Sequence, residues 1–503
     1  MGRSLIVAVL LLTTAFIGAR YAVAGQAPFA ASDPDIPISH QDRVYSAEQY
    51  SNTVSVTDPV DNRLIGTIRL GDPLPANLSP LYKGQLLVHG MGFSPDRRTI
   101  AVVAIGSNAV NFIDTATNSV KHVTYVGRSP HEAFFTTDGR EVWVVVRGEN
   151  YVSVLEGTTY EEKTRITVPN GPGMTIFSPD GKYGYVCSSF TPETVVISVT
   201  DHKIVGRVPQ ASPFCPNIAA TPDGKQVWFT LKDTGKTQVF DGQPPFALLK
   251  TLDTGPITNH VNIVRNSNGM FAYVTIGGLN EIKVFRTDNF EQVATIPVGQ
   301  LPHGIWPSGD GTRVYVGFEN EDKIAAIDTV KNEVIATSPI GQAPQALVYV
   351  PDAVPAASDA INSAMTRMMV VPEGLGTSNL QPLGVAGQSA QLSLAPPGAK
   401  KDGKAPTSVS LSDQGLVQVL EAAVTGLEPG KPYLLALAAE PSGTGVVEPL
   451  QSFMTNPAGA AVVNAIGPIR QLIRGEDKAP RRYLVILPGT PATHGAPVQV
   501  QTE

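Results

Sequence analysis

Half of the eight histidines in this 503-residue sequence fall at, or next to, one position of a repeating pattern. They are His89, His131, His260 and His303. Imidazole nitrogen is a good ligand for copper, zinc, iron and nickel, so histidines that gather in one place indicate a transition-metal site. Two alternatives stay open: a metal-free pocket for a polar ligand, or side chains that cap strand ends and hold water.

Other polar residues fall close to the same repeated position. Glu132, Asn217 and Asn262 follow it by one residue, and Gln345 is its equivalent in the last repeat. An acid and amides there would orient a polar ligand or support the histidines by hydrogen bonds. Three charged residues, nine positions after their turns, are expected to flank the same face as ligand-binding groups or as solvated rim charges: Arg147, Lys232 and Glu319.

The repeat itself is marked by tight-turn dipeptides that recur every 42 to 45 residues. Asp-Gly and Asn-Gly favour hairpin turns because both residues tolerate positive φ. A strand precedes each turn, and the strand after it opens on an aromatic residue in five of six copies. Four strands in about 42 residues is the size of a propeller blade. The turns are Asp96-Arg97, Asp138-Gly139, Asp180-Gly181, Asp223-Gly224, Asn268-Gly269 and Asp310-Gly311.

Six blades are complete, and the two ends of the repeat region supply a seventh. Residues 43–70 predict three strands that lack a first one, and residues 345–350 predict a first strand with nothing after it. Joining them closes the ring and removes exposed sheet edges, which would otherwise invite aggregation. We therefore predict an all-β protein with a seven-bladed β-propeller over residues 40–352 and the histidines at one mouth of its central channel.

Residues 178–186, SPDGKYGYV, resemble the YVTN family of β-propeller repeats, which includes YncE-like and surface-layer-type exported proteins. The resemblance covers residues 43–352, about three fifths of the chain. Propellers serve many unrelated roles, so it implies a fold and not an activity. The axial histidines are also similar to those of exported copper propellers, such as nitrous oxide reductase and methanethiol oxidases of the selenium-binding type, although no further motif is shared.

The two cysteines are expected on neighbouring blades at the channel mouth. Cys187 ends the second strand of its blade, and Cys215 precedes the first strand of the next blade. In an oxidising compartment they would form a disulfide that joins the two blades. Cys215 as a soft copper ligand, or a pair of free buried thiols, are the alternatives.

The first 24 residues have the pattern of a secretory signal peptide. Arg3 supplies a positive end, residues 5–19 supply an apolar core, and residues 22–24 are small enough for cleavage. A retained anchor is the alternative, but Arg20 interrupts a run that is already short for a membrane span. We expect a periplasmic or secreted protein whose mature chain has no transmembrane segment.

The composition changes after the repeats. Residues 353–365, which contain Pro and several Ala, predict a linker. Short apolar runs separated by Pro and Gly then predict about seven strands, and therefore a small β-sandwich over residues 366–503. The runs are 368–371, 390–394, 408–411, 417–423, 433–438, 461–464 and 483–487.

The net charge and the missing catalytic motifs limit the classes of function that the sequence supports. The 37 basic and 44 acidic residues give a net charge of −7, which argues against a nucleic-acid partner. Nucleophile-elbow, phosphate-loop, zincin and haem-attachment motifs are missing. Three hypotheses follow: a cell-envelope protein that binds a small molecule or an envelope protein at the channel mouth, a metal-dependent oxidoreductase that uses copper or another transition metal, or a lactonase-like hydrolase with Glu132 as its base.

Overall fold

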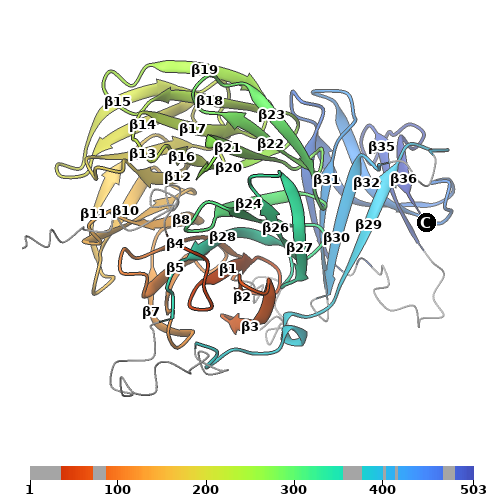
Figure 1. Cartoon of the computed structure of the whole chain (residues 1–503). Helices are drawn as coiled ribbons and strands as arrows, with labels where there is room; N and C mark the ends of the chain where they lie inside the picture. The colour runs from red at the N-terminus through yellow and green to blue at the C-terminus, as the bar shows by residue number, and fades with distance from the viewer. Residues whose placement is uncertain are drawn as a thin grey trace, which may run out of the picture.

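The computed structural model describes residues 36–71, 86–354, 376–399, 404–413, 417–467, 469 and 482–502. These residues form seven four-stranded antiparallel sheets around a common axis and one eight-stranded sheet beside them (Figure 1). The predicted seven-bladed propeller and the all-β class are confirmed. Within the described ranges there is no α-helix, and one 3-10 helix, η2 (Leu383–Ala386), precedes the last sheet.

The first three blades follow one another along the chain, and each runs from an inner strand to an outer one. Blade 1 contains β4 (Val88–Phe93), β5 (Thr99–Ala104), β6 (Ala109–Asp114) and β7 (Ser119–Tyr125). Blade 2 contains β8 (Pro130–Phe135), β9 (Glu141–Val146), β10 (Tyr151–Glu156) and β11 (Glu162–Thr167). Blade 3 contains β12 (Pro172–Phe177), β13 (Tyr183–Ser188), β14 (Glu193–Ser198) and β15 (Lys203–Pro209).

Blades 4 to 6 repeat the arrangement. Blade 4 contains β16 (Ile218–Ala220), β17 (Gln226–Leu231), β18 (Lys236–Asp241) and β19 (Leu248–Asp253). Blade 5 contains β20 (Thr258–Asn266), β21 (Gly269–Ile276), β22 (Glu281–Arg286) and β23 (Gln292–Pro297). Blade 6 contains β24 (Pro302–Pro307), β25 (Arg313–Phe318), β26 (Lys323–Asp328) and β27 (Glu333–Pro339).

Blade 7 is assembled from both ends of the repeat region, as predicted. Its strands lie in the order β28 (Pro344–Val350), β1 (Arg43–Glu48), β2 (Thr53–Asp58) and β3 (Arg63–Arg69). The pairing of β28 with β1 is antiparallel and places Tyr45 opposite Val348. The first strands of neighbouring blades contact one another all the way round, so β28 also packs against β4 and β24.

The aromatic residue of each second strand joins its blade to the next. Tyr185 donates a hydrogen bond of 2.7 Å to the carbonyl of Gly242, and Tyr273 donates one of 3.0 Å to the carbonyl of Thr329. Both carbonyls follow the third strand of the next blade. Trp143 and Trp228 fill the equivalent positions with wholly buried rings. The repeated aromatic is therefore an inter-blade contact, which explains its periodicity.

The C-terminal residues form one eight-stranded sheet in the order β33-β32-β35-β36-β29-β30-β31-β34. Its edge strands β33 and β34 contact each other, so the sheet nearly closes around a core of aliphatic side chains. The predicted β-sandwich-like domain is confirmed in this form. Its strands are β29 (Ser389–Ala395), β30 (Thr407–Asp413), β31 (Gln418–Val424), β32 (Pro432–Ala438), β33 (Val447–Met454), β34 (Ala461–Gly467), β35 (Tyr483–Pro488) and β36 (Gln499–Gln501).

The C-terminal domain packs on the loops of blades 5 to 7 at the end where the first strands begin. Asn320, in the loop between β25 and β26, donates to Ser408 Oγ at 2.9 Å. Asp322 in the same loop accepts from Gln391 Nε2 at 2.9 Å and also bonds Ser389 Oγ. An apolar cluster of Ile257, Leu301, Ala423 and Ala460 completes the contact. The domain therefore covers one side of the channel mouth.

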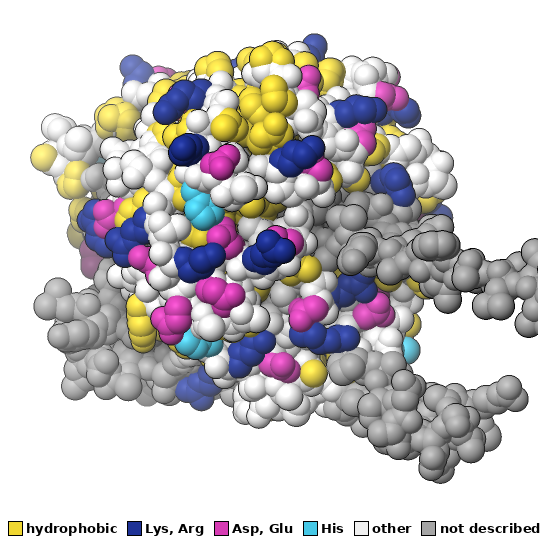
Figure 2. Space-filling model, turned by 90° about the vertical axis from the view of Figure 1, so that its left-hand side faces the viewer, with side chains coloured by type: hydrophobic (Ala, Val, Ile, Leu, Met, Phe, Trp, Pro, Cys, Tyr) yellow, Lys and Arg dark blue, Asp and Glu magenta, His cyan; other side chains and the backbone are white. Residues whose placement is uncertain are grey.

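Several sequence predictions fall on residues that lie outside the described ranges. The signal peptide, most of the linker at 353–365 and the run at 368–371 belong to this group. Among the described residues, no helix has the length and hydropathy needed to span a membrane. On the face shown in Figure 2, basic and acidic side chains are interspersed rather than gathered into a basic field.

Candidate functional site

Each of the four repeat-position histidines lies in a β-bulge where the first strand of a blade begins. In β4 the pairing with β5 changes register after Val88, and His89 lies in the shift. Bulges re-aim side chains that would otherwise follow the alternation of the strand, and here they direct them towards the channel. Equivalent shifts contain His131 in β8, His260 in β20 and His303 in β24.

The observed register also corrects the alignment of blade 5. Thr258 pairs with Ile276 and Val261 with Val274, so two bulge positions lie between them. Asn259 takes the first position, where the other blades have histidine, and His260 takes the second. Counted from the last paired residue before each shift, Glu132 of blade 2 corresponds to His260, although Glu132 itself pairs with Val145 and only His131 lies in the shift of that blade.

The four imidazoles form a continuous chain across the mouth. The ring centroids of His89 and His131 lie 4.3 Å apart, those of His89 and His303 6.1 Å, and those of His260 and His303 4.7 Å. Each residue is less than a tenth exposed. The structure thus brings together all four histidines that the repeat predicted.

Glu132 lies at the His131 end of this row of imidazoles. Together with His89 and His131 it forms a compact group of possible metal ligands. One ligand atom from each of His89, His131 and Glu132 lies within 4.8 Å of the others, and all three residues are buried. Gly90 permits this approach, because a Cβ there would lie 2.1 Å from the carbonyl oxygen of His131 and 2.2 Å from Glu132 Oε2. Two imidazoles and a carboxylate form a donor set that suits iron, copper or zinc.

Hydrogen bonds fix the orientation of two of the imidazoles. His131 Nδ1 lies 2.6 Å from the carbonyl oxygen of Gly173, which only accepts, so Nδ1 carries the proton and Nε2 keeps its lone pair. His303 Nδ1 lies 2.8 Å from Glu319 Oε2 and donates to that carboxylate. A carbonyl or carboxylate behind the second ring nitrogen is the usual support of a metal-binding histidine.

Burial sets the protonation states at the mouth. Desolvation lowers the pKa of His89, His131, His260 and His303 well below the usual value, with neighbouring cations and imidazoles adding to the effect. The imidazoles are therefore neutral near pH 7, the form that binds metal. Desolvation raises the pKa of Glu132 well above its usual value, so this carboxyl is protonated unless a cation lies beside it.

A small internal cavity of about 20 Å³ lies below the imidazoles, lined by Glu132, His260 and Trp306 among others. Glu132 Oε1, His260 Nε2 and Trp306 Nε1 are buried there without a hydrogen-bond partner among the described residues. A volume of this size holds about one water molecule when polar groups line it. The lower end of the site therefore offers three unpaired polar atoms to a small polar guest.

The predicted amide ligands are bonded within the protein. Asn217 Oδ1 accepts from the amide of Val261 at 3.0 Å, and Asn262 Nδ2 donates to the carbonyl of Ile305 at 3.1 Å. Gln345 Nε2 donates to Glu319 Oε1. Asn217 and Asn262 line the cavity, but these bonds hold neighbouring blades together.

Two cations lie at the mouth, one on blade 2 and one on blade 4, and Lys232 lies within electrostatic reach of Glu319 and of Glu421 on the C-terminal domain. The Arg147 guanidinium carbon is 4.8 Å from the ring centre of Phe214, and Lys232 Nζ is 5.9 Å from the same ring. Arg147 follows β9 and Lys232 follows β17 directly. Both reach the mouth from the second strands of their blades.

The cysteines meet beside this aromatic ring. Cys187, at the end of β13, and Cys215, just before β16, form a disulfide with an S–S distance of 2.13 Å. The amide of Cys215 also donates to the carbonyl of Ser188 at 3.0 Å. The bond joins blades 3 and 4 and fixes the segment that carries Phe214.

The C-terminal domain contributes an acid that the sequence pattern did not indicate. Glu421 on β31 is buried, accepts from Tyr50 Oη at 3.0 Å and contacts Glu319. Burial and the neighbouring Glu319 raise the pKa of Glu421 well above its usual value, which favours the protonated form of Glu421. No repeat relates Glu421 to the propeller, and only the packing of the two domains brings it to the mouth.

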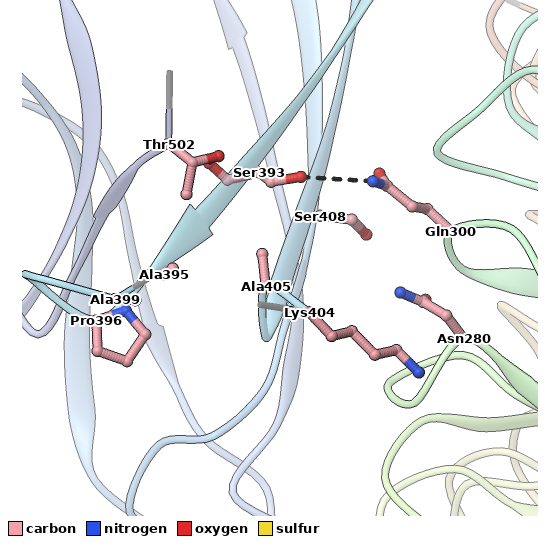
Figure 3. A pocket seen from close by; sticks show the side chains of 10 residues that line it. All are labelled: Asn280, Gln300, Ser393, Ala395, Pro396, Ala399, Lys404, Ala405, Ser408 and Thr502. Atoms are coloured by element: carbon pink, nitrogen blue, oxygen red, sulfur yellow. Dashed lines mark hydrogen bonds between the residues drawn. The ribbon is translucent and has the colours of Figure 1, made fainter. Parts of the chain in front are cut away.

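A separate pocket of about 360 Å³ lies between the propeller and the C-terminal domain (Figure 3). Its walls carry the amides of Asn280 and Gln300 on one side and Ser393, Ser408 and Lys404 on the other. Gln300 Nε2 lies 3.4 Å from Ser393 Oγ and bridges the two walls. The imidazoles are not part of this pocket.

No protein-family model matches the chain, and no curated protein matches its sequence. The chain is similar in structure to a functionally unknown protein from Desulfotomaculum acetoxidans DSM 771, at 14% identity and a TM-score of 0.51 over 61% of this chain and 98% of that one. It is also similar to hydrazine synthase of Kuenenia stuttgartiensis, at 18% identity and a TM-score of 0.46 over 53% and 89%. At these identities the likeness concerns the fold alone.

Proposed function

We propose that the protein binds a first-row transition-metal ion at the mouth of the propeller channel. His89, His131 and Glu132 are the proposed ligands, and His260 and His303 lie next to them. The observation that carries the proposal is the convergence of three buried donor atoms within 4.8 Å. Two atoms of these residues, His89 Nδ1 and Glu132 Oε1, are buried without a hydrogen-bond partner in the described protein.

The electrostatics of the site support the same function. Neutral imidazoles need not lose a proton to bind a metal, and the protonated Glu132 exchanges its proton for the ion. A buried carboxyl with a raised pKa is a poor base near pH 7, so the geometry favours a metal ligand over a hydrolytic base for Glu132. Copper is the first metal to test, because imidazole-rich sites of this kind suit it and it binds most tightly among the divalent ions of its row.

The remaining features fit a binding protein of the cell envelope. The first 24 residues have the pattern of an export signal, and a disulfide between blades suits an oxidising compartment. The six turn motifs support membership in the YVTN-repeat family. The C-terminal domain covers one side of the mouth, so a small molecule or partner would approach the metal from the other side.

Metal analysis of the purified full chain tests the proposal. After incubation with copper, zinc or ferrous iron and extensive dialysis, we expect about one ion per chain, held by the three ligands. Alanine at His89 or His131 should reduce the bound metal to background, and Glu132→Gln should weaken binding by about 10- to 100-fold because the amide supplies no charge.

His494→Ala is the matched control, because His494 is exposed on the C-terminal domain and should leave the metal content unchanged. The proposal is wrong if the correctly folded wild-type protein retains no metal, or if His89→Ala and His131→Ala retain as much as His494→Ala. Circular dichroism of each variant separates a lost ligand from a lost fold.

A further inference from the structure

Arg147 and Lys232 share one aromatic ring at the open side of the mouth. Their cationic groups lie 4.8 Å and 5.9 Å from the centre of Phe214, and Arg147 also lies 5.7 Å from the centre of Phe190. Cation–π contacts of this length hold the two side chains in place without neutralising them. Two positive charges are thus positioned side by side.

Neither cation forms a salt bridge with a described residue, although Asp233 acts on both of them, and Glu319 and Glu421 act on Lys232, over longer distances. Within the described residues, no Asp or Glu oxygen lies within 4.0 Å of Arg147 or Lys232, and the buried Nε atom of Arg147 has no hydrogen-bond partner. Lysines at the other end of the blades differ, since Lys182 pairs with Asp180 at 2.9 Å and Lys225 with Asp223 at 3.3 Å. A half-buried guanidinium that lacks an anion has incurred the cost of desolvation without the compensating ion pair.

The backbone holds the two cations and the ring as one unit. The amide of Lys232 donates to the carbonyl of Phe214 at 3.0 Å, and the amide of Arg147 donates to the carbonyl of Ser129 at 3.1 Å. The residue after Phe214 is Cys215, which the disulfide ties to blade 3. Loop mobility is restricted at three points, which is the pre-organisation that a binding site requires.

The cations also act on the imidazoles. Arg147 and Lys232 both contribute to lowering the pKa of His89, after the larger effect of burial, and Lys232 does the same for His303. Such effects require the positive groups to lie close to the histidine chain. An anion held by the cations would therefore lie at the same channel mouth as the proposed metal.

We propose that Arg147, Lys232 and Phe214 form a binding site for the oxyanion group, carboxylate or phosphate, of a small-molecule ligand. The planar guanidinium matches two oxygens of such a group, and the ammonium supplies a second charge. This inference deepens the proposed function, because it names an anionic molecule as the ligand that reaches the metal. The anion site itself requires no metal, so the two proposals can fail separately.

Isothermal titration of the metal-free full chain with oxalate, and separately with inorganic phosphate, tests the site at low ionic strength. We expect saturable binding of at least one of the two anions, and the preferred anion tells carboxylate from phosphate ligands. Arg147→Gln and Lys232→Gln should each weaken that binding by about tenfold, the cost of losing one charged hydrogen bond. Arg147→Lys should recover part of the affinity for the anion, because lysine keeps the positive charge but lacks the planar guanidinium that donates to two oxygens at once.

Lys182→Gln is the matched control, since it removes a lysine at the far end of blade 3 and should leave anion binding unchanged. The inference is overturned if the wild type binds neither anion, or if Arg147→Gln and Lys232→Gln bind like Lys182→Gln. Copper titration of the same variants separates the two proposals: anion binding without metal binding contradicts only the metal site, and metal binding without anion binding contradicts only the anion site.

Discussion

The two sides of the channel mouth differ in how their charged side chains are paired. On the side covered by the C-terminal domain, Glu319 accepts from His303 and Gln345, and Glu421 accepts from Tyr50. On the open side, next to blades 2 to 4, Arg147 and Lys232 make cation–π contacts with Phe214 and form no salt bridge with a described residue. The covered side thus pairs most of its charged groups with polar side chains, although Glu421 Oε1 has no partner among the described residues, whereas the two cations of the open side have no such polar partner.

This difference separates stability from binding. Buried polar groups in folded proteins are almost always paired. An unpaired group destabilises the fold, so its presence indicates a role other than stability. The covered side should therefore contribute to the stability of the domain contact. The open side should contribute little to stability and more to ligand affinity.

The largest effect should come from the covered side. Glu319→Ala removes a buried carboxylate and leaves His303 and Gln345 without their partner, so we expect a loss of about 4 kcal/mol in the free energy of unfolding. Urea denaturation followed by tryptophan fluorescence measures it, because all three tryptophans lie in the propeller. Exposed Glu161→Ala is the control, and an equally small loss in both variants would contradict the comparison.

Removing the disulfide should have the next largest effect. The bond closes a loop with a sequence separation of 28, so changing both Cys187 and Cys215 to Ser should cost about 3 kcal/mol through the entropy of the unfolded chain. The same denaturation experiment, with and without reducing agent, measures it. A wild type whose stability is unaffected by complete reduction would show that the open side is rigid without the bond.

A pH dependence should follow from the domain contact at Asp322. Burial raises the pKa of Asp322 to about 6, from 3.8. Because the folded pKa is the higher one, the contribution is fully present below about pH 4 and is lost as the pH rises through 6. Wild-type protein should lose roughly 2 kcal/mol between pH 4 and 7 from this group, and Asp322→Asn should not.

Glu440→Gln, an exposed change on the same domain, provides the comparison for Asp322→Asn. Urea midpoints for the three proteins at the two pH values give the measurement. Parallel pH profiles for wild type and Asp322→Asn would mean that this carboxyl titrates as it does in water.

The smallest effect on stability belongs to the open side. Arg147→Gln should change the free energy of unfolding by less than about 1 kcal/mol, because the side chain loses a cation–π contact but also a desolvation cost. Thermal melting of the metal-free protein measures it. A loss as large as that of Glu319→Ala would show that Arg147 is structural and would remove the contrast between the two sides.

The sequence predicted the blades because their contacts repeat. The Asp-Gly turns, the aromatic of each second strand and the shared seventh blade recur at a fixed period, so each copy supports the others. The same period placed His89, His131 and His303 at the mouth. It placed His260 there too, although only the bulge of β20 shows which of its two positions the imidazole takes.

The rest of the site depends on contacts that have no period. Glu421 comes from another domain, more than a hundred residues after Glu319, and nothing in its local sequence points to the channel. Phe214 lies in an irregular segment whose position depends on the disulfide and on backbone bonds to Lys232. Long-range packing of this kind is decided by the whole fold, so a pattern in one stretch of chain does not predict it.

The shared seventh blade also sets the order of events during synthesis. Strand β1 is made among the first residues of the repeat region, but its inner neighbour β28 follows only after six more blades. Until then the toroid stays open and the histidines of blades 1 and 6 have no common wall between them. A nascent chain shorter than about 350 residues therefore lacks the closed channel.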